Sequence, residues 1–422
     1  MSLSLIPKPS STTLLQGHFS LKSVDEIISS DISNIEAMFL QKFLEFHHNH
    51  KPHLRITNSQ ENTKETPPST TYTHTIFLEI GKTLSRKTNE DYQLHITPLG
   101  AHILAPTSTG IFYGIQSLCQ LADAYGENIP CVKILDTPRF PWRGFMLDEG
   151  RHFFGKEVVL KLLDVLALLK INRFHWHLVE DQGWRIEIKK YPKLTEVGGN
   201  RPDTALGRRK KDGFEGKPHK GYYMQEEIRE IVAYAKMRHI VVIPEIEIPG
   251  HCTAALAAYP EFSCRGEPLT VPPHFGIFKE IFCAGKESTF TFLQDIVDEI
   301  MPLFPDAYIH LGGDEAPKAR WKACAKCQQR IAELGLKNEK TLQAYFTNRL
   351  ITYLADHGKI GVGWNEILHP NLHPEAIAQF WMGRRAKKMK YLRAGQNMIM
   401  SDFFPLYLDY NYGVHPLRKV YA

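Results

Sequence analysis

From about residue 138 onward, short apolar runs alternate with longer stretches of helical periodicity. Apolar residues recur at helical spacing in 156–169, 225–237 and 289–303, and each of these stretches follows an apolar run and a loop. Seven of the runs are expected to be strands, at residues 144–147, 173–178, 240–246, 307–311, 360–364, 376–381 and 397–401. Repeated strand–loop–helix units predict a parallel sheet with helices outside it, and this number of strands predicts an α/β fold, the (β/α)8 TIM barrel.

Residues 1–137 predict a smaller, separate domain of the α+β type. Helical spacing appears at 34–48 and again around 111–121. Strand-like runs lie at 75–80, 92–97 and 101–105. No catalytic grouping stands out in this part, so we expect a structural role for it. The second domain, residues 138–422, is expected to be the catalytic barrel.

Composition excludes several classes of protein. With 422 residues, 43% of them hydrophobic, the chain can bury one large core and a smaller one. The net charge is only +5, and the short basic runs at 208–211 and 384–390 contain no interleaved aromatic residues, so nucleic-acid binding is not expected. No apolar segment approaches membrane-spanning length, and the N-terminus lacks the basic and apolar regions of a signal peptide. The protein therefore either stays inside the cell or has lost a signal, in which case the periplasm or secretion is favoured.

The seven cysteines predict no metal site. Cys264 and Cys283 flank a loop and could form a disulfide in an oxidising compartment. Cys324 and Cys327 form a CxxC motif without a second pair, so a zinc site is not expected, and neither is any other metal or cofactor. The odd number leaves at least one thiol free.

One apolar run ends in two glycines and two adjacent carboxylates, Tyr308-Ile-His-Leu-Gly-Gly-Asp-Glu315. Neighbouring side chains of a strand point to opposite faces, but glycine frees the backbone, so Asp314 and Glu315 can both face one cleft. Two carboxylates held together titrate apart, one ionised and one protonated near neutral pH, which is what acid-assisted cleavage of a glycosidic bond requires. The alternative is a helix N-cap, where acidic residues are also favoured.

Residues that follow the predicted strands would share one rim of the barrel, because active sites lie at the C-terminal strand ends. Carboxylates, an arginine and tryptophans recur there. They are Asp148, Glu149, Arg151, His177, Glu180, Asp181, Gln182, Trp184, Glu245, Glu247, His251, Asp314, Glu315, Trp364, Asn365, Glu366, Trp381, Tyr407 and Asp409. Indole rings stack on the C–H faces of a pyranose and charged groups bind its hydroxyls, so this composition predicts a sugar pocket.

Seven motifs occur in a fixed order along this part of the chain. They are Arg151-His-Phe-Phe, His175-Trp-His-Leu-Val-Glu-Asp-Gln-Gly-Trp184, Gly221-Tyr-Tyr-Met-Gln-Glu-Glu, Ile243-Pro-Glu-Ile-Glu-Ile-Pro-Gly-His251, His310-Leu-Gly-Gly-Asp-Glu315, Gly363-Trp-Asn-Glu366 and Tyr407-Leu-Asp409. Together they resemble the family 20 glycoside hydrolases, the β-N-acetylhexosaminidases. Ile6-Pro-Lys-Pro and Gly110-Ile-Phe-Tyr-Gly-Ile-Gln resemble the small α+β domain that precedes the barrel of this family, so the resemblance covers nearly the whole chain.

The resemblance implies exo-acting hydrolysis of terminal, non-reducing β-linked N-acetylglucosamine or N-acetylgalactosamine on an oligosaccharide or glycoconjugate. In this family the 2-acetamido group of the substrate is the nucleophile, and the reaction passes through an oxazolinium intermediate with retention. By resemblance, Glu315 is the general acid and then the base. Asp314 accepts a hydrogen bond from the acetamido N–H, and Tyr407 binds the acetamido oxygen.

The remaining site residues follow from the same resemblance. Arg151 and Asp409 would bind sugar hydroxyls, and Trp364 and Trp381 would wall the pocket. A supporting network around Asp314 would contain Glu180 and His251. Two alternatives stay open: the arginine could be a structural partner of Asp148 or Glu149, and the histidine could cap a helix.

The sequence departs from the family pattern in two ways. Glu180 and Glu247 stand where many members have aspartate, which lengthens each side chain by one methylene. The barrel of the family also continues beyond Tyr407-Leu-Asp409 with an eighth strand, whereas only seven strands are counted here. An open barrel would expose strand edges, so we expect a truncated form.

Two other functions fit parts of the pattern. A metal-dependent barrel hydrolase could use His175, His177, His251 and His310, although each lies in apolar sequence, where barrel histidines are commonly part of the core. A non-catalytic fragment that binds N-acetyl sugars would keep the pocket without turnover.

Overall fold

The computed structural model describes residues 3–58, 73–82, 88–207 and 212–409, so the basic run 208–211 lies outside the described residues. The chain forms two compact units. Unit 1 contains Met1–Gly144, Lys161–Arg173 and Tyr234–Ile240, and unit 2 contains the rest. These units do not follow a single cut in the sequence, so the division at residues 137 and 138 stays a prediction.

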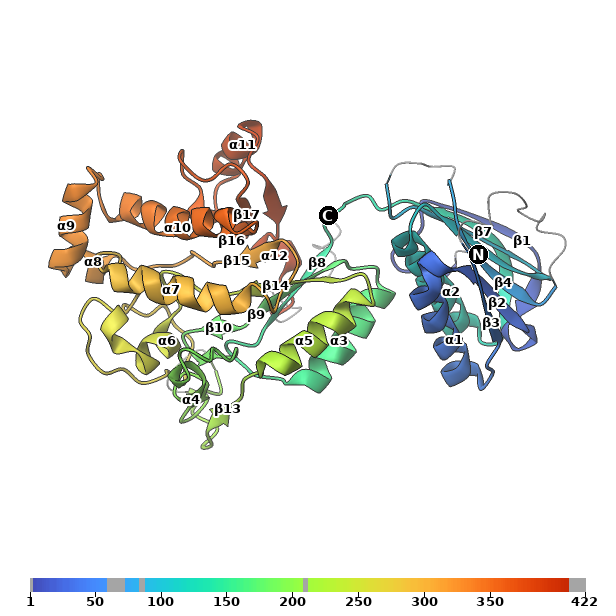
Figure 1. Ribbon diagram of the computed structural model, residues 1–422, viewed down its shortest axis with the longest axis horizontal. Coiled ribbons are helices and arrows are strands. Elements are labelled where there is room, and N and C mark those ends of the chain that lie inside the picture. The colour runs from blue at the N-terminus through green and yellow to red at the C-terminus, as the bar shows by residue number, and fades with distance from the viewer. Residues whose placement is uncertain (1–2, 59–72, 83–87, 208–211, 410–422) are drawn as a thin grey trace. The chain divides into compact units, whose positions relative to one another are not determined.

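Unit 1 is built on a seven-stranded sheet of order β1-β7-β5-β6-β4-β2-β3 (Figure 1). The strands are β1 (Ser11–Ser20), β2 (Glu26–Ser30), β3 (His53–Thr57), β4 (Thr75–Ile80), β5 (Tyr92–Thr97), β6 (Gly100–Ala105) and β7 (Asn128–Asp136). Helices α1 (Asn34–His48) and α2 (Ser108–Tyr125) lie with it, and short 3-10 turns occur at Leu21–Ser23 and Asp31–Ser33. Sequence periodicity located β4, β5, β6 and both helices. It did not locate β2, β3 or β7, and it also missed β1, whose residues are almost all exposed and give no buried-face alternation.

Glycines let α2 pack closely on the sheet of unit 1. A Cβ at Gly110 would lie 2.4 Å from the carbonyl oxygen of Asp91, and one at Gly114 would lie 2.5 Å from Cγ2 of Ile103. Both distances are shorter than any side chain tolerates, so the Gly110-Ile-Phe-Tyr-Gly114 motif is explained by helix–sheet packing.

Unit 2 contains the curled parallel sheet that the sequence predicts, in the order β18-β17-β16-β15-β14-β9-β8. The strands are β8 (Gly144–Asp148), β9 (Arg173–His177), β14 (Val241–Glu245), β15 (Tyr308–His310), β16 (Ile360–Trp364), β17 (Ile377–Phe380) and β18 (Met398–Met400). All seven predicted strands are present, and β14 to β18 pair in parallel register. Among the described residues the sheet ends at β8 and β18, which gives the half-barrel form of a TIM-type α/β fold.

Helices connect these strands (Figure 1). The helices are α3 (Lys156–Leu168), α4 (Lys193–Glu196), α5 (Gln225–Lys236), α6 (Thr253–Ala258), α7 (Glu287–Ile300), α8 (Ala319–Ala323), α9 (Ala325–Glu333), α10 (Glu339–Asp356), α11 (Arg385–Arg393) and α12 (Phe403–Leu406). Short strand pairs β10 (Val179–Glu180) with β11 (Gly183–Trp184), and β12 (Asn200–Arg201) with β13 (His219–Lys220), lie in the loops, as do 3-10 turns η4 (Pro260–Phe262) and η5 (Asn365–Ile367). None of the described helices combines the length and apolar character of a membrane span.

Amphipathic periodicity explains how the longer helices cover the sheet. In α7, Phe290, Leu293 and Val297 are buried at helical spacing, whereas Asp298 on the other side bonds Tyr353 of α10. Helix α10 begins at Asn338, whose side chain accepts hydrogen bonds from the backbone in a capping box.

The cysteines correct the interpretation of the CxxC motif as an isolated pair. All seven thiols are free, and the structure brings Cys264 and Cys283 against Cys324 and Cys327. No local pattern predicts this grouping, because Cys264 and Cys283 lie 41 residues or more upstream of Cys324.

Candidate active site

The loop after β15 turns sharply at the glycines that the sequence singled out. Gly312 and Gly313 have φ angles of 62° and 109°, and Glu315 has a φ of 40°. A Cβ at Gly312 would lie 1.8 Å from Oε2 of Glu247, so no other residue fits there. The next helix, α8, begins at Ala319 with Lys318 as its N-cap, so the carboxylate pair does not cap a helix.

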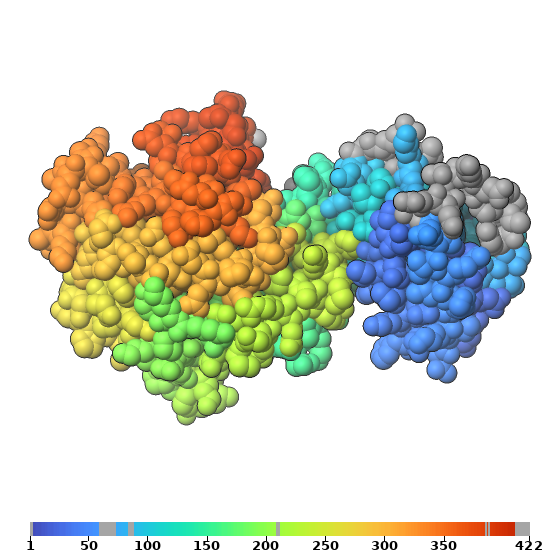
Figure 2. All heavy atoms as spheres, in the orientation of Figure 1, coloured from blue at the N-terminus to red at the C-terminus, as the bar shows by residue number. Residues whose placement is uncertain are grey.

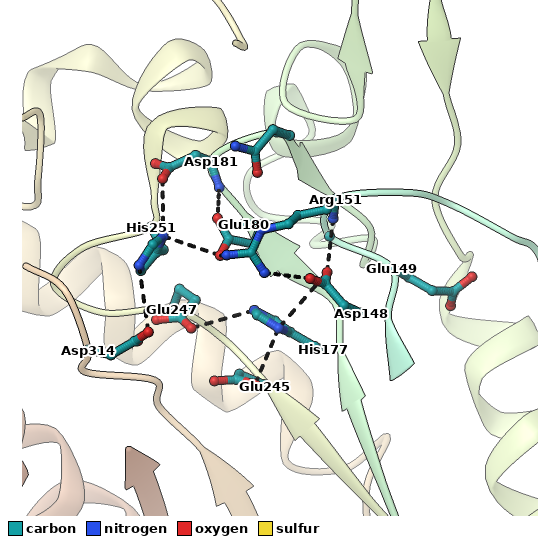
Figure 3. A network of polar contacts seen from close by, with 12 residues as sticks. Asp148, Glu149, Arg151, His177, Glu180, Asp181, Glu245, Glu247, His251 and Asp314 are labelled. Carbon is teal, nitrogen blue, oxygen red and sulfur yellow. Dashed lines mark hydrogen bonds and ion pairs between the residues drawn. The ribbon is translucent and has the colours of Figure 1, made fainter. Parts of the chain in front are cut away.

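His251 connects the carboxylate pair to a second pair of acids (Figure 3). Its Nε2 atom lies 3.7 Å from Asp314 Oδ2 and 3.6 Å from Glu315 Oε2. Its Nδ1 atom lies 3.2 Å from both Glu180 Oε1 and Asp181 Oδ2. Burial disfavours the charged imidazolium, but these anions, above all Glu180, raise the pKa of His251 well above its ordinary value. The imidazole is therefore a buried cation between four acidic groups, and its alternative role as a helix cap is wrong, because Cys252 is the N-cap of α6.

Arg151 extends this network to the end of β8. One guanidinium nitrogen pairs with Glu180, and Nη1 lies 2.5 Å from Asp148 Oδ2 (Figure 3). Burial would raise the pKa of the Glu180 carboxyl, but the charges of Arg151 and His251 lower it to about 2. The arginine is thus partly an ion-pair partner of Asp148, as the alternative interpretation allowed, and it also reaches the predicted site.

Two of the strand-end residues are structural instead of lining the rim. Glu149 points away from the network and accepts hydrogen bonds from Trp176 Nε1 (2.6 Å) and the Tyr223 hydroxyl (2.7 Å) (Figure 3). Trp184 is buried, and its Nε1 donates to the carbonyl of Ile186. Buried polar atoms need hydrogen-bond partners, and these hydrogen bonds give Glu149 and Trp184 a role in stabilising the core.

A layer of histidines and glutamates lies beneath the carboxylate pair. Glu245 contacts His175 Nε2 at 2.7 Å and His310 Nδ1 at 2.8 Å. His177 lies 3.6 Å from Glu245 and 3.5 Å from Glu247. Each set of three, His175 with Glu245 and His310 or His177 with Glu245 and Glu247, lies close enough together to hold a cation, but the imidazoles already contact the carboxylates directly. The interpretation of barrel histidines as core residues therefore explains His175 and His310, which are buried.

The two adjacent carboxylates have different environments. Burial, together with the charges of Glu245, Glu180 and Glu366, raises the pKa of Asp314 to about 7, although the His251 cation opposes this. The Asp314 side chain is 16% exposed, whereas that of Glu315 is 28% exposed. The pair therefore offers one deeply placed carboxyl poised near neutrality and a neighbour that is more accessible from outside.

Aromatic residues lie at the ends of β16 to β18. Trp364 is buried and its ring centroid lies 6.4 Å from that of Trp381. Phe403 follows at 6.1 Å from Trp381, and Tyr407 lies 5.1 Å from Phe403. Burial raises the pKa of Tyr407, and the nearby charges of Asp314 and Glu245 add to this effect, so its hydroxyl is a protonated donor at neutral pH.

Some of the predicted site residues contact one another directly, whereas others lie apart from this network. Direct contacts link Arg151, Glu180, His251, Asp314 and Glu315. The two tryptophans and Tyr407 form the aromatic series, and Asp409 is exposed beyond it, with its charge adding to the rise in the tyrosine pKa.

Two of the predicted strand-end residues that were given no catalytic or sugar-binding role hold the site in place. The side-chain oxygen of Asn365 accepts hydrogen bonds from the backbone N–H groups of Trp381 (3.0 Å) and Met382 (3.4 Å). Asp181 accepts from the backbone of Thr253 at 2.9 Å and so fixes the start of α6. Both follow a predicted strand, which is the only signal that the sequence offered.

Comparison with known proteins agrees with this geometry. The model of the glycosyl hydrolase family 20 catalytic domain matches residues 140–422, and the model of domain 2 of the same family matches residues 2–137. The chain therefore belongs to glycosyl hydrolase family 20.

The chain is also similar to individual members of this family. It is 46% identical to a β-hexosaminidase of Porphyromonas gingivalis over 82% of this chain and 46% of that protein. The crystal structure of a β-N-acetylhexosaminidase from Bacteroides fragilis matches with a TM-score of 0.77 and 32% identity, over 98% of this chain and 78% of that one. An exo-β-N-acetylglucosaminidase from Vibrio harveyi, in complex with N-acetylglucosamine, matches with a TM-score of 0.81 and 29% identity, over 97% of this chain and 62% of that one. The chain thus spans about half the length of the Porphyromonas relative.

Proposed function

We propose that this chain carries the catalytic site of an exo-acting β-N-acetylhexosaminidase that cleaves terminal β-linked N-acetylglucosamine or N-acetylgalactosamine. The observation that carries the proposal is the pair of Asp314 and Glu315, held beside one buried histidine cation in two different environments. The similarity to β-hexosaminidases of known structure supports the same activity.

Glu315 supplies the proton in the first step. The acetamido carbonyl oxygen of the substrate attacks the anomeric carbon, the glycosidic C–O bond breaks, and the carboxyl proton of Glu315 passes to the departing oxygen. An oxazolinium ion remains on the sugar. In the second step water attacks the anomeric carbon, gives its proton to the Glu315 carboxylate, and opens the ring to restore the acetamide. Two inversions give overall retention.

Asp314 and Tyr407 act on the acetamido group. An ionised Asp314 accepts a hydrogen bond from the N–H and balances the positive charge that develops on the ring. The protonated Tyr407 hydroxyl donates to the acetamido oxygen and holds it near the anomeric carbon. The acetamido oxygen is tethered to the sugar, and Asp314 and Tyr407 are already oriented around it. Both effects lower the activation free energy, so no protein side chain has to act as the nucleophile.

The remaining residues bind the sugar. Arg151 is oriented by Asp148 and Glu180 and donates to ring hydroxyls, and the exposed Asp409 accepts from another hydroxyl. The indoles of Trp364 and Trp381 form the apolar wall for the N-acetyl methyl group.

The test compares aryl β-glycosides that differ only at C2. The chain should release the aryl group from the 2-acetamido sugars and not from the 2-hydroxy sugar, because only the acetamide supplies the nucleophile. Proton NMR during turnover should show the β-anomer of the free sugar forming first. Tight sugar binding without release would instead support a non-catalytic binding fragment. Equal rates on the 2-acetamido and 2-hydroxy glycosides, or an α-anomer product, would contradict the mechanism.

A further inference from the structure

Four cysteines that the proposed reaction does not use meet in unit 2. Cys264 lies just beyond η4, Cys283 lies two residues before Gly285, and Cys324 and Cys327 lie at the start of α9. The yellow and orange parts of the chain that contain them lie side by side (Figure 1, Figure 2). The four sulfur atoms all lie within 4.8 Å of one another.

Three of the sulfur–sulfur distances are close to those of a tetrahedral site. The Cys283 sulfur lies 3.6 Å from that of Cys327 and 3.8 Å from that of Cys324, and the Cys264 sulfur lies 3.9 Å from that of Cys327. Zinc–thiolate bonds of about 2.3 Å place the four sulfurs of a tetrahedral site about 3.8 Å apart. In a 4Fe–4S cluster each thiolate binds a different iron atom, and in a 2Fe–2S cluster the four thiolates are divided between two iron atoms, so both spread the four sulfurs more widely than a single ion does.

The backbone around Cys283 is shaped for this arrangement. Ser263 and Phe282 form an antiparallel bridge, and the N–H of Cys283 donates to the carbonyl of Phe262 at 2.8 Å, so the segments of the first two cysteines run side by side. A Cβ at Gly285 would lie 2.3 Å from the carbonyl carbon of Lys326, so a glycine is required where the two segments meet.

Positive side chains surround the cluster. The ammonium of Lys286 donates to the carbonyls of Glu261 and Ser263, both at 2.7 Å, and Arg330 donates to the carbonyl of Gly285 at 3.4 Å. A zinc ion with four thiolates carries a net charge of about −2, so nearby cations stabilise it.

We propose that the four cysteines bind one structural zinc ion as thiolates. Binding releases the thiol protons and needs no oxidant. Four protein ligands close the coordination sphere, so the ion has a structural and not a catalytic role.

The ion would fasten two segments next to the candidate active site. The indole of Trp321, three residues before Cys324, donates to the carbonyl of Phe282 at 2.8 Å, and the N–H of Phe282 donates to the carbonyl of Pro249 at 3.0 Å. Pro249 lies two residues before His251, and the segment with Trp321 follows Glu315. The inference does not depend on the proposed reaction, because metal binding is measured without a substrate.

The test begins with metal analysis of the unmodified chain, purified under reducing conditions without chelator. Elemental analysis should find one zinc per chain, and a mercurial reagent that modifies thiols should release it in step with loss of the thiols. Replacement by cobalt should give the intense visible absorption bands of tetrahedral cobalt thiolate. No zinc, and no such bands when cobalt is added to the reduced chain, would overturn the proposal, as would stoichiometric iron in place of zinc.

Variants locate the ion. Cys264→Ser and Cys324→Ser change the two half-buried cysteines and should lower bound zinc at least tenfold in competition with a chelator. Cys119→Ser and Cys131→Ser change buried cysteines of unit 1 and are the matched controls, which should keep full zinc. If the first two variants retain zinc like the controls, the site is wrongly placed. If they do not fold, the cobalt spectrum of the unmodified chain decides.

Discussion

The two halves of the half-barrel rim are built from different chemistry. At the ends of β8, β9, β14 and β15, acids, an arginine and a histidine form a continuous network of ion pairs around Asp314. At the ends of β16, β17 and β18, aromatic rings lie in series from Trp364 to Tyr407. The polar half sets protonation states, whereas the aromatic half offers an apolar surface with few charges.

This difference separates two kinds of effect on an enzyme. Buried charges act where charge develops in a reaction, so changes in the polar half should appear mainly in kcat. Indole surfaces contact substrate and transition state alike, so changes in the two tryptophans of the aromatic half should appear mainly in KM.

Removing the acid should have the largest effect. Glu315→Gln should lower kcat roughly a hundredfold to ten-thousandfold, because general acid catalysis contributes about this much. The loss should be smaller for aryl leaving groups that need little protonation. Steady-state rates on a series of aryl N-acetyl-β-glucosaminides measure this, with circular dichroism as the check on folding. A full rate on the least reactive aglycone would refute the assignment.

Removing its neighbour should come next. Asp314→Ala should lower kcat on N-acetylated substrates roughly a hundredfold to a thousandfold, since it deletes one oriented group that stabilises developing charge. Asp123→Ala, which removes an exposed aspartate of α2, is the matched control and should leave the rate unchanged. A fall only in KM would place Asp314 in substrate binding alone.

The pH profile tests the raised pKa of Asp314. The proposed reaction needs the ionised carboxylate of Asp314, and its pKa is raised to about 7, so the active form should be lost as the pH falls through 7. We expect kcat/KM to fall about tenfold per pH unit below that value. An acid limb near pH 4, the ordinary range of an aspartate, would contradict the environment described for this residue.

The aromatic half should respond differently. Trp381→Ala should raise KM roughly fivefold to thirtyfold with little change in kcat, because it removes about 1–2 kcal/mol of apolar contact that is equal in substrate and transition state. Trp381→Phe keeps part of that surface and should be intermediate. If kcat falls as far as in the Asp314 variant, the separation of the two halves fails.

One residue links the two halves and gives the smallest effect. The Glu366 carboxylate accepts a hydrogen bond from Trp381 Nε1 at 3.2 Å. The charge of Glu366 also contributes to raising the pKa of Asp314. Glu366→Gln keeps an acceptor for the indole and removes the charge, so the acid limb of kcat/KM should move to lower pH while KM stays nearly constant. A shift of the acid limb to higher pH would show that the charge of Glu366 does not raise the pKa of Asp314.

Much of the fold could be predicted because its signals are local. The seven barrel strands are short apolar runs, and α1, α5 and α7 have clear helical spacing, so their positions follow from the order of residues. Strand β1 carries no such pattern, since its residues are exposed on both faces, and it is recognised only by its pairing with β7. The anchoring of Trp381 by Asn365 likewise depends on two strands that lie side by side.

The family, the strand–helix order and the turn that carries Asp314 and Glu315 are all readable from the order of residues, because glycines and apolar periodicity act over a few residues. Three features depend on the folded chain: Glu149 supports the core, His251 lies between two pairs of acids, and four distant cysteines meet. Burial and charge depend on neighbours from several strands and loops. For that reason the protonation of Asp314 and the grouping of the cysteines follow from the folded chain and not from any single segment of it.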